Sequence, residues 1–290
     1  MINHNRAINR VFTRKVITDL IEYGSNEVFD VVVKRHVDDP ESKTHGQIIS
    51  EIYTHLYKEH RNEYYYMNTL LNRLLVGYHS VNTTTALSQI RVGQHIVDFV
   101  MINGEFRAYE IKSNLDNFER LYDQISDYYK AFSKVTLLTS LQHEYEKIVE
   151  MLHGLGDLGD AVGICLINND DDYINRNYRR EPKQYDYYLD HTCIFKLLRK
   201  KEYENALIDY YGKLPEVAPV FYFRECLAWF SQIPIIKAQD LARIELKKRN
   251  KICKTVFDKI QPELKSTMYF AGLSRKLPQL EAFLQSNYRR

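Results

Sequence analysis

An α/β core with helical extensions is the fold class that the sequence predicts. Between residues 61 and 170, segments with the period of an amphipathic helix alternate with short apolar segments typical of strands. The composition is that of a globular protein, with 44% hydrophobic and 27% charged residues. A chain of 290 residues is long enough for two or three compact units.

The elements of the core follow from apolar periodicity and from the turn signal Asn103-Gly104. In chain order they are a helix over 63–77, strands over about 86–92, 95–102 and 106–112, a helix that begins near 114, a strand over 134–140, a helix over 141–153 and a strand over 161–168. The helix near 114 is favoured by an apolar stripe that includes Leu121 and Ile125.

Helical extensions are expected on both sides of this core. Residues 1–60 form the N-terminal extension, because helical spacing covers 7–34 and 47–59. Residues 171–290 form a basic, mainly helical C-terminal region. The polar, tyrosine-rich segment 168–188 before it predicts a linker or a strapped-down loop.

Charge is divided unevenly along the chain. Residues 171–290 carry 23 Lys and Arg against 15 Asp and Glu, a net charge of +8, whereas residues 1–170 carry 17 against 23, a net charge of −6. A catalytic part joined to a part that binds a polyanion explains this division, and a basic helical domain that is merely soluble explains it as well.

The sequence predicts a cytoplasmic protein that does not bind membranes. The opening "MINHNRAINRVFTRK" lacks the apolar segment of a signal peptide, and no run approaches 18 apolar residues. The four cysteines lie far apart without a CxxC pair, which excludes a zinc knuckle and a secreted disulfide framework: Cys165, Cys193, Cys226 and Cys253.

Two opposite charges end one of the predicted strands. In "VDFVMINGEFRAYEIKS" (97–113), Glu110 and Lys112 project from one side of the strand and Ile111 from the other. A Glu-x-Lys string occurs five times in the chain, but only this one ends an apolar strand, one hairpin after another acid, Asp98. Such charges are costly at a mostly buried sheet edge unless they are used. An ion cluster that only caps the sheet is the structural alternative.

These residue types suit the hydrolysis of a phosphodiester. Mg²⁺ neutralises charge on the scissile phosphate and activates water, and it is bound by hard oxygen ligands. Asp98 and Glu110 can supply carboxylates, and the Ile111 carbonyl a third protein oxygen. Lys112 can stabilise developing negative charge or orient the attacking water. We therefore expect Mg²⁺ as the cofactor, with Mn²⁺ as a substitute.

The site requires an irregular hairpin register. A two-residue turn at Asn103-Gly104 would pair Asp98 with Tyr109, and Asp98 would then point away from Glu110. We therefore predict a three-residue loop, or a bulge with glycine in a left-handed conformation. A regular two-residue turn would count against the site.

The stretch "VDFVMINGEFRAYEIKS" (97–113), followed by "RLYDQISDYY", resembles the PD-(D/E)XK phosphodiesterase superfamily. The likeness is greatest to its small stand-alone bacterial members, in which an E-I-K-S string runs into a helix. The resemblance covers about 61–170 and implies a restriction-endonuclease-like core, a mixed sheet flanked by helices. Asp98, Glu110 and Lys112 take the positions of the motif residues. Gln124 and Tyr128 stand as the QxxxY of RecB-type nucleases. Val97 replaces the preferred proline.

Further site candidates are less specific. Many members of the superfamily place an acid on the helix before the first strand, and the candidate is Glu63, which a solvated helix surface explains as well. Arg120 can contact phosphate or pair with a neighbouring aspartate. The densest basic run offers further phosphate contacts, or a plain solvated helix face: Lys247, Lys248, Arg249, Lys251 and Lys254.

The expected function is a Mg²⁺-dependent endo- or exonuclease that hydrolyses nucleic acid, DNA rather than RNA. The resemblance implies 5′-phosphate and 3′-hydroxyl products, a homodimer in many relatives, and phage-defence or mobile-element work. The first alternative is a nucleic-acid-binding protein that keeps the nuclease fold without turnover. The second is an interaction protein whose basic tail binds a partner or a membrane surface.

Overall fold

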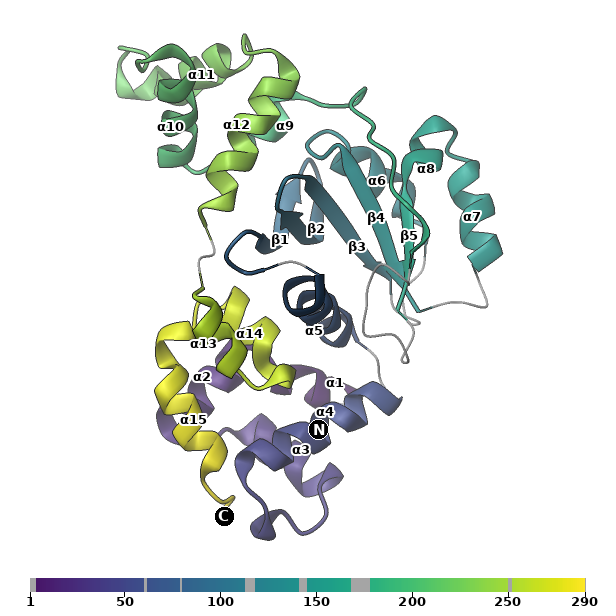
Figure 1. Cartoon of the computed structure of the whole chain (residues 1–290), viewed down its shortest axis with the longest axis vertical. Helices are drawn as coiled ribbons and strands as arrows, with labels where there is room; N and C mark the ends of the chain where they lie inside the picture. The colour runs from purple at the N-terminus through teal and green to yellow at the C-terminus, as the bar shows by residue number, and fades with distance from the viewer. Residues whose placement is uncertain are drawn as a thin grey trace. The chain divides into compact units, whose positions relative to one another are not determined.

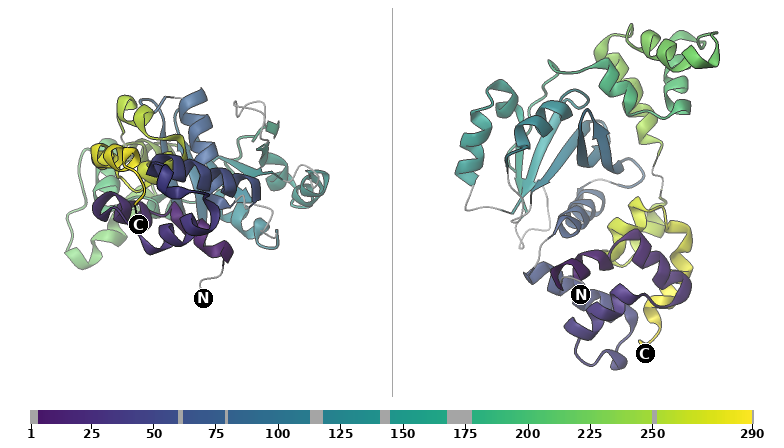
Figure 2. Two further views of the ribbon diagram at one scale, coloured as in Figure 1. Left: turned by 90° about the horizontal axis from the view of Figure 1, so that it is seen from below. Right: turned by 180° about the vertical axis from the view of Figure 1, so that it is seen from behind.

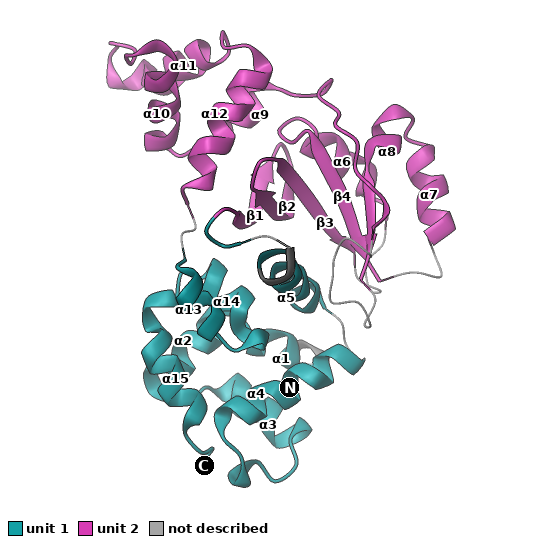
Figure 3. Cartoon of the chain, viewed as in Figure 1, with its two compact units in different colours: residues 1–82, 252–290 teal, residues 83–251 magenta. Residues whose placement is uncertain are grey.

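The computed structural model describes residues 4–59, 62–78, 80–112, 118–140, 145–167, 178–249 and 252–289. The chain forms two compact units (Figures 1 and 3). Unit 1 combines residues 1–82 with 252–290, and unit 2 comprises residues 83–251. These units cut across the three ranges 1–60, 61–170 and 171–290, which stay a prediction.

Unit 1 is built from helices of both parts of its sequence. The first part contributes α1 (His4–Val11), α2 (Arg14–Tyr23), α3 (Glu27–His36), α4 (His45–Glu59) and α5 (Glu63–Asn72), which continues as a π-helical segment over Arg73–Tyr78. The second part contributes α13 (Lys254–Lys259), α14 (Lys265–Phe270) and α15 (Leu277–Gln285). Buried Asn68 joins the two parts, since its amide donates to the Pro262 carbonyl and accepts from the Ser266 N–H.

The single helical segment expected over 7–34 is divided into three helices, for local reasons. Gly24 ends α2 in a left-handed conformation with φ 72°. The Asn26 side chain then accepts from the N–H groups of Val28 and Phe29 and so begins α3. Apolar periodicity alone does not reveal such a break, because the stripe continues on both sides of it.

Unit 2 contains a six-stranded mixed sheet in the order β1-β2-β3-β4-β5-β6. Its strands are β1 (Thr85–Val92), β2 (His95–Ile102), β3 (Phe106–Lys112), β4 (Lys134–Thr139), β5 (Gly163–Leu166) and β6 (Tyr178–Arg180). β1 to β3 form an antiparallel meander, β3 to β5 run parallel, and β6 is antiparallel to β5. The predicted α/β core with a mixed sheet is confirmed, and β6 is a strand within the segment expected to be a linker or loop.

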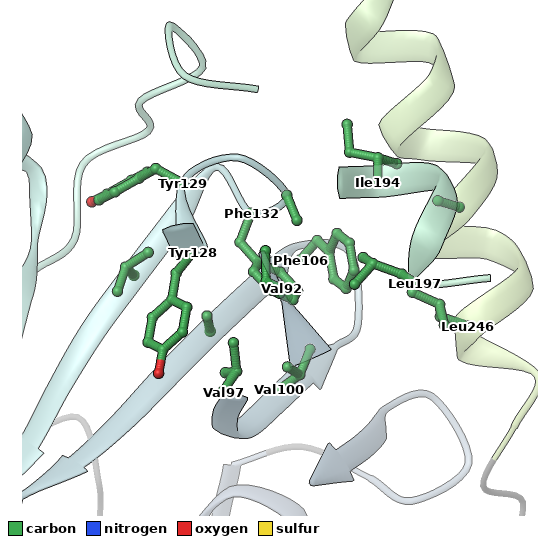
Figure 4. Packing of buried hydrophobic residues seen from close by; sticks show 14 of the residues in the cluster. Val92, Val97, Val100, Phe106, Tyr128, Tyr129, Phe132, Ile194, Leu197 and Leu246 are labelled. Carbon is green, nitrogen blue, oxygen red and sulfur yellow. The ribbon is translucent and has the colours of Figure 1, made fainter. Parts of the chain in front are cut away.

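Unit 2 also contains seven helices in its described residues: α6 (Leu121–Tyr128), α7 (Tyr145–His153), α8 (Asp157–Ala161), α9 (His191–Lys196), α10 (Lys200–Tyr211), α11 (Pro219–Phe230) and α12 (Ile235–Lys247). Helices α6, α9 and α12 contact the sheet, whereas α10 packs on α12 and α11 on α9. α6 lies across one face of the sheet, as the view from behind in Figure 2 shows. Side chains of the strands, of α6 and of α9 to α12 share one hydrophobic core (Figure 4). The basic segment after β6 therefore folds together with the sheet as far as α12.

No helix in the described ranges is long and apolar enough to cross a membrane.

Candidate active site

The β2–β3 hairpin has the irregular register that the site requires. Ile102 pairs with Phe106, so the loop contains three residues, and the Asn103 side chain accepts from the Glu105 N–H at 2.8 Å. Continued by one step beyond the Phe99–Tyr109 pair, this register sets Asp98 opposite Glu110 on one face. The predicted three-residue loop is confirmed. It forms without Gly104 in a left-handed conformation.

Glu110 and Lys112 are buried at the end of β3. The Lys112 Nζ lies 2.9 Å from Glu110 Oε1, and only 9% and 4% of the two side chains are exposed. Asp98, on β2, accepts from the Ile111 N–H at 2.9 Å through Oδ2. The neighbouring strand thus holds the Asp98 carboxylate at the level of the ion pair.

Two residues of α6 complete the cluster. Gln124 donates from Nε2 to Glu110 Oε1 at 2.7 Å and accepts from the Lys112 Nζ at 3.0 Å. The Tyr128 hydroxyl lies 2.7 Å from Glu110 Oε2 and 2.8 Å from the Ile96 carbonyl. The i, i+4 spacing on one helix brings both side chains to the same carboxylate. The structure therefore brings together all five residues of the predicted catalytic set: Asp98, Glu110, Lys112, Gln124 and Tyr128.

Burial and the negative charge of Glu110 raise the pKa of Tyr128 well above its ordinary value. The phenol therefore stays protonated, and its single proton is shared between the Glu110 carboxylate and the Ile96 carbonyl. Tyr128 links β2, β3 and α6 in this way. We conclude that Tyr128 holds the carboxylate in place and does not act as a base at neutral pH.

Asp127 anchors α6 to the turn between β1 and β2, and the sequence reasoning missed it. It accepts from the Gln94 N–H at 2.9 Å and lies 2.7 Å from His95 Nδ1. Gly93 has φ 57°, and a Cβ at this position would lie 2.6 Å from the Asp127 carboxylate. The positive φ and the close carboxylate both favour glycine at this position. Two sequence features could have indicated this contact: Gly93-Gln94 lies between two apolar strands, and Asp127 directly precedes Tyr128.

Gln89 is a second residue that sequence reasoning missed. It lies within β1 with φ 55°, a left-handed conformation that costs a residue with a side chain about 1 kcal/mol. The pairs Ser88–Phe99 and Ile90–Val97 on either side place Gln89 level with Asp98. A distortion of β1 thus lies beside the strand that carries the first carboxylate, and no sequence signal indicates it.

Within the described residues, the hydrogen bonds and the ion pair named for this cluster do not include the other two candidates, Glu63 and Arg120. Glu63 is the first residue of α5 in unit 1, and its place in a metal site stays a prediction. Arg120 is exposed at the start of α6, one turn before Gln124. Arg120 is therefore accessible for a phosphate contact.

The basic run has partners within the protein. The Lys247 Nζ donates to the Asn103 carbonyl at 3.0 Å, and Lys248 pairs with Glu245. Arg249 is half-buried and pairs with Glu202. Lys254 is in unit 1 and pairs with Asp258 at 2.8 Å, whereas Lys251 lies outside the described residues. A phosphate contact from Arg249 would require the loss of its buried ion pair.

The donor set fits a hard divalent cation. Asp98 and Glu110 offer two carboxylates, and the Ile111 backbone carbonyl lies between Glu110 and Lys112 in the same strand. Within the described ranges, no three His, Cys, Asp or Glu side chains form a metal-binding group. One or two carboxylates are nevertheless enough for Mg²⁺ when waters and a substrate phosphate complete the shell, and Asp98 and Glu110 would supply them.

Comparison with known proteins shows a family but no individual relative. No curated protein and no solved structure matches the sequence. The model of the family described as bacteriophage P4 protein cII matches residues 57–286. This match spans the candidate active site and most of the sequence outside it. The chain therefore belongs to the bacteriophage P4 cII protein family.

Proposed function

We propose that this protein is a metal-dependent nuclease that hydrolyses phosphodiester bonds in nucleic acid, DNA rather than RNA. The observation that supports the proposal is the convergence of Asp98, Glu110 and Lys112 through an irregular hairpin register. A regular two-residue turn would have separated these side chains. The order of a meander, a helix and a parallel strand also agrees with the proposed restriction-endonuclease-like core of the PD-(D/E)XK superfamily.

Each residue has a role in this proposal. When bound, the divalent cation supplies positive charge beside the scissile phosphate and lowers the pKa of water. Asp98 and Glu110 hold it. Lys112 stabilises the negative charge that develops on the phosphate oxygens. Gln124 contacts both Glu110 and Lys112, so it fixes the ammonium group and the carboxylate relative to each other.

The burial of the ion pair supports a use beyond stability. Removing two charges from water costs several kcal/mol for each ion, and their mutual attraction only partly offsets this cost. An apolar pair at the end of β3 would avoid that cost. In a catalytic site the same burial is an advantage, because water does not screen the charges. The Glu110 carboxylate then attracts a metal ion more strongly, and the Lys112 ammonium attracts a phosphate more strongly.

One observation favours a second function, a nucleic-acid-binding protein without turnover. Glu110 and Lys112 pair with each other, and Gln124 contacts both groups. A network that is satisfied internally also serves a purely structural purpose. In that case the protein binds nucleic acid through other surfaces, and the ion pair only fixes the end of the sheet.

The test compares wild-type protein with Lys112→Ala and Asp98→Asn on linear duplex, supercoiled plasmid, single-stranded DNA and RNA. Reactions contain Mg²⁺, Mn²⁺ or a chelator. We expect metal-dependent cleavage that falls by at least about 100-fold in both variants, because each removes charge that acts on the transition state. Asp98→Asn keeps the shape of the side chain, which guards against a loss of fold.

Lys134→Ala is the matched control, because Lys134 is also a sheet lysine that pairs with a glutamate. Its cleavage rate should equal that of the wild type. Cleavage that survives in Lys112→Ala and Asp98→Asn would refute the assigned site. No cleavage in any reaction, together with binding that weakens steeply with salt, would favour the second function.

A further inference from the structure

Three donors surround the Glu110 carboxylate. Its Oε1 lies 2.9 Å from Lys112 Nζ and accepts from Gln124 Nε2 at 2.7 Å. Its Oε2 accepts from the Tyr128 hydroxyl at 2.7 Å. A carboxylate offers about four lone-pair positions, two on each oxygen. Within the described residues, both positions of Oε1 are therefore occupied, and one position of Oε2 is left.

Glu110 is also one of the two carboxylates that hold a divalent cation in the proposed nuclease. Asp98 and Glu110 carry two negative charges and Lys112 one positive charge, a formal net charge of −1. Beside a divalent cation on Glu110, the Lys112 ammonium is a second positive charge on one carboxylate. The two positive charges repel each other with little screening by water, because only 9% of Lys112 and 4% of Glu110 are exposed.

We infer that Lys112 takes the place of the divalent cation in the metal-free protein, and that the ammonium and the cation compete for Glu110. This inference rests on the proposed function. Lys112 compensates the buried Glu110 charge as long as no cation is present, which avoids the cost of a lone buried carboxylate. Lys112 keeps a partner when it leaves Glu110, because its Nζ also lies 3.0 Å from Gln124 Oε1. The internally satisfied network is then the metal-free state of the site.

Competition for Glu110 and a purely structural ion pair lead to different results when Lys112 is replaced. If Lys112 serves only the fold, its removal costs stability and does not improve the binding of divalent cations. If Lys112 competes with a cation, removal of its charge changes the formal charge of the cluster from −1 to −2. A neutral variant then attracts a divalent cation more strongly than the wild type does.

The experiment measures the binding of Mn²⁺ to the full chain without nucleic acid, from the loss of the free Mn²⁺ signal in electron paramagnetic resonance. Wild-type protein is compared with Lys112→Met and Lys112→Gln, which both remove the charge. Methionine keeps most of the length of the side chain. Glutamine keeps a hydrogen-bond donor for Glu110 and serves if the methionine variant does not fold. We expect both variants to bind Mn²⁺ at least about tenfold more tightly than the wild type.

Three controls separate the charge of Lys112 from other effects. Lys134→Met removes another sheet lysine that pairs with a glutamate, and it should bind Mn²⁺ like the wild type. Gln124→Met removes a neutral donor from the same Glu110 oxygen, and it should change the affinity less than either Lys112 variant. Asp98→Asn added to Lys112→Gln should abolish the gain in affinity, which would place the cation at this site.

The outcomes distinguish this inference from the proposed function. Folded Lys112 variants that bind Mn²⁺ no more tightly than the wild type would overturn the competition and leave the nuclease to the cleavage assay. Tighter binding in these variants, together with no cleavage by the wild type, would support the competition and count against the nuclease. No Mn²⁺ binding by any of the proteins would refute both. Circular dichroism of every variant excludes a loss of fold as the cause.

Discussion

The two ends of strand β3 each carry a glutamate–lysine pair, and the two pairs differ in burial. Near the start of β3, Glu105 pairs with Lys134 and with Arg107, and 41% of Glu105 and 23% of Lys134 are exposed. At the end of β3, Glu110 and Lys112 are almost fully buried. The same two residue types therefore meet on one sheet in two different environments.

The half-exposed Glu105–Lys134 pair is explained by its support of the fold, whereas the buried Glu110–Lys112 pair requires a further explanation. Burial raises the pKa of Glu105, but hydrogen bonds from Lys134 and Arg107 outweigh it and leave the pKa lowered. Water screens such a half-exposed pair, which is worth about 1 kcal/mol or less. The buried pair carries a large desolvation cost, and a cation or a phosphate that uses its charges would offset that cost.

The largest expected effect concerns the stability of the two pairs. Lys112→Ala leaves the Glu110 carboxylate buried without its cation, so we expect it to lower the free energy of unfolding by about 3 kcal/mol or more. Lys134→Ala should lower it by less than about 1 kcal/mol. Chemical denaturation of the two variants measures both values. Equal losses would mean that the difference in burial has no energetic counterpart.

A smaller effect is expected from divalent cations. If Asp98 and Glu110 hold a cation, millimolar Mg²⁺ raises the melting temperature of the wild type by about 3 °C, through binding to the folded state alone. Asp98→Asn should lose this shift, whereas Lys134→Ala should keep it. Thermal unfolding with and without Mg²⁺ measures it. A shift that persists in Asp98→Asn would place the cation elsewhere.

The smallest effect concerns the anchor that brings α6 to the buried pair. Burial raises the pKa of Asp127, but hydrogen bonds from Lys130, His95 and Gln94 outweigh it, so the folded-state pKa lies below the ordinary value. The stabilisation is therefore complete above the unfolded-state pKa of about 3.9 and is lost as pH falls through the folded-state value. Asp127→Asn should cost about 1 kcal/mol at pH 7.

The difference in unfolding free energy between Asp127→Asn and wild type should shrink as pH falls below about 4. Asp123→Asn changes an exposed aspartate of the same helix and serves as the control, with no comparable change of the difference with pH. A constant difference for Asp127→Asn would show that the carboxylate charge does not hold the anchor. Denaturation curves between pH 3 and pH 7 decide between these outcomes.

Local patterns were sufficient to predict the sheet and the position of the charged pair. Short apolar segments bounded by turn residues identified β1 to β5. The loop of three residues followed from one requirement, that Asp98 and Glu110 share a face. Such inferences succeed because period and register are properties of neighbouring residues.

Long-range pairing was not predictable in this way. Ser286 lies beside His45 and Ser266 beside Asn68, about 200 or more positions apart, and no periodicity connects them. The partners of Arg249 and Lys247 were equally hidden, so their run of charges resembled a free basic surface. The left-handed Gln89 has no sequence signal, because glutamine is not a residue that favours that conformation.

The divided sequence of unit 1 also sets the order in which the chain can fold during synthesis. Residues 1–82 leave the ribosome before unit 2, but α13 to α15 follow only after the whole of unit 2. At a translation rate of roughly 5–20 residues per second, this delay is about 10–40 s. During this delay the apolar faces of α1 to α5 lack the helices that complete unit 1. These faces of the nascent chain are then open to chaperone binding and to aggregation.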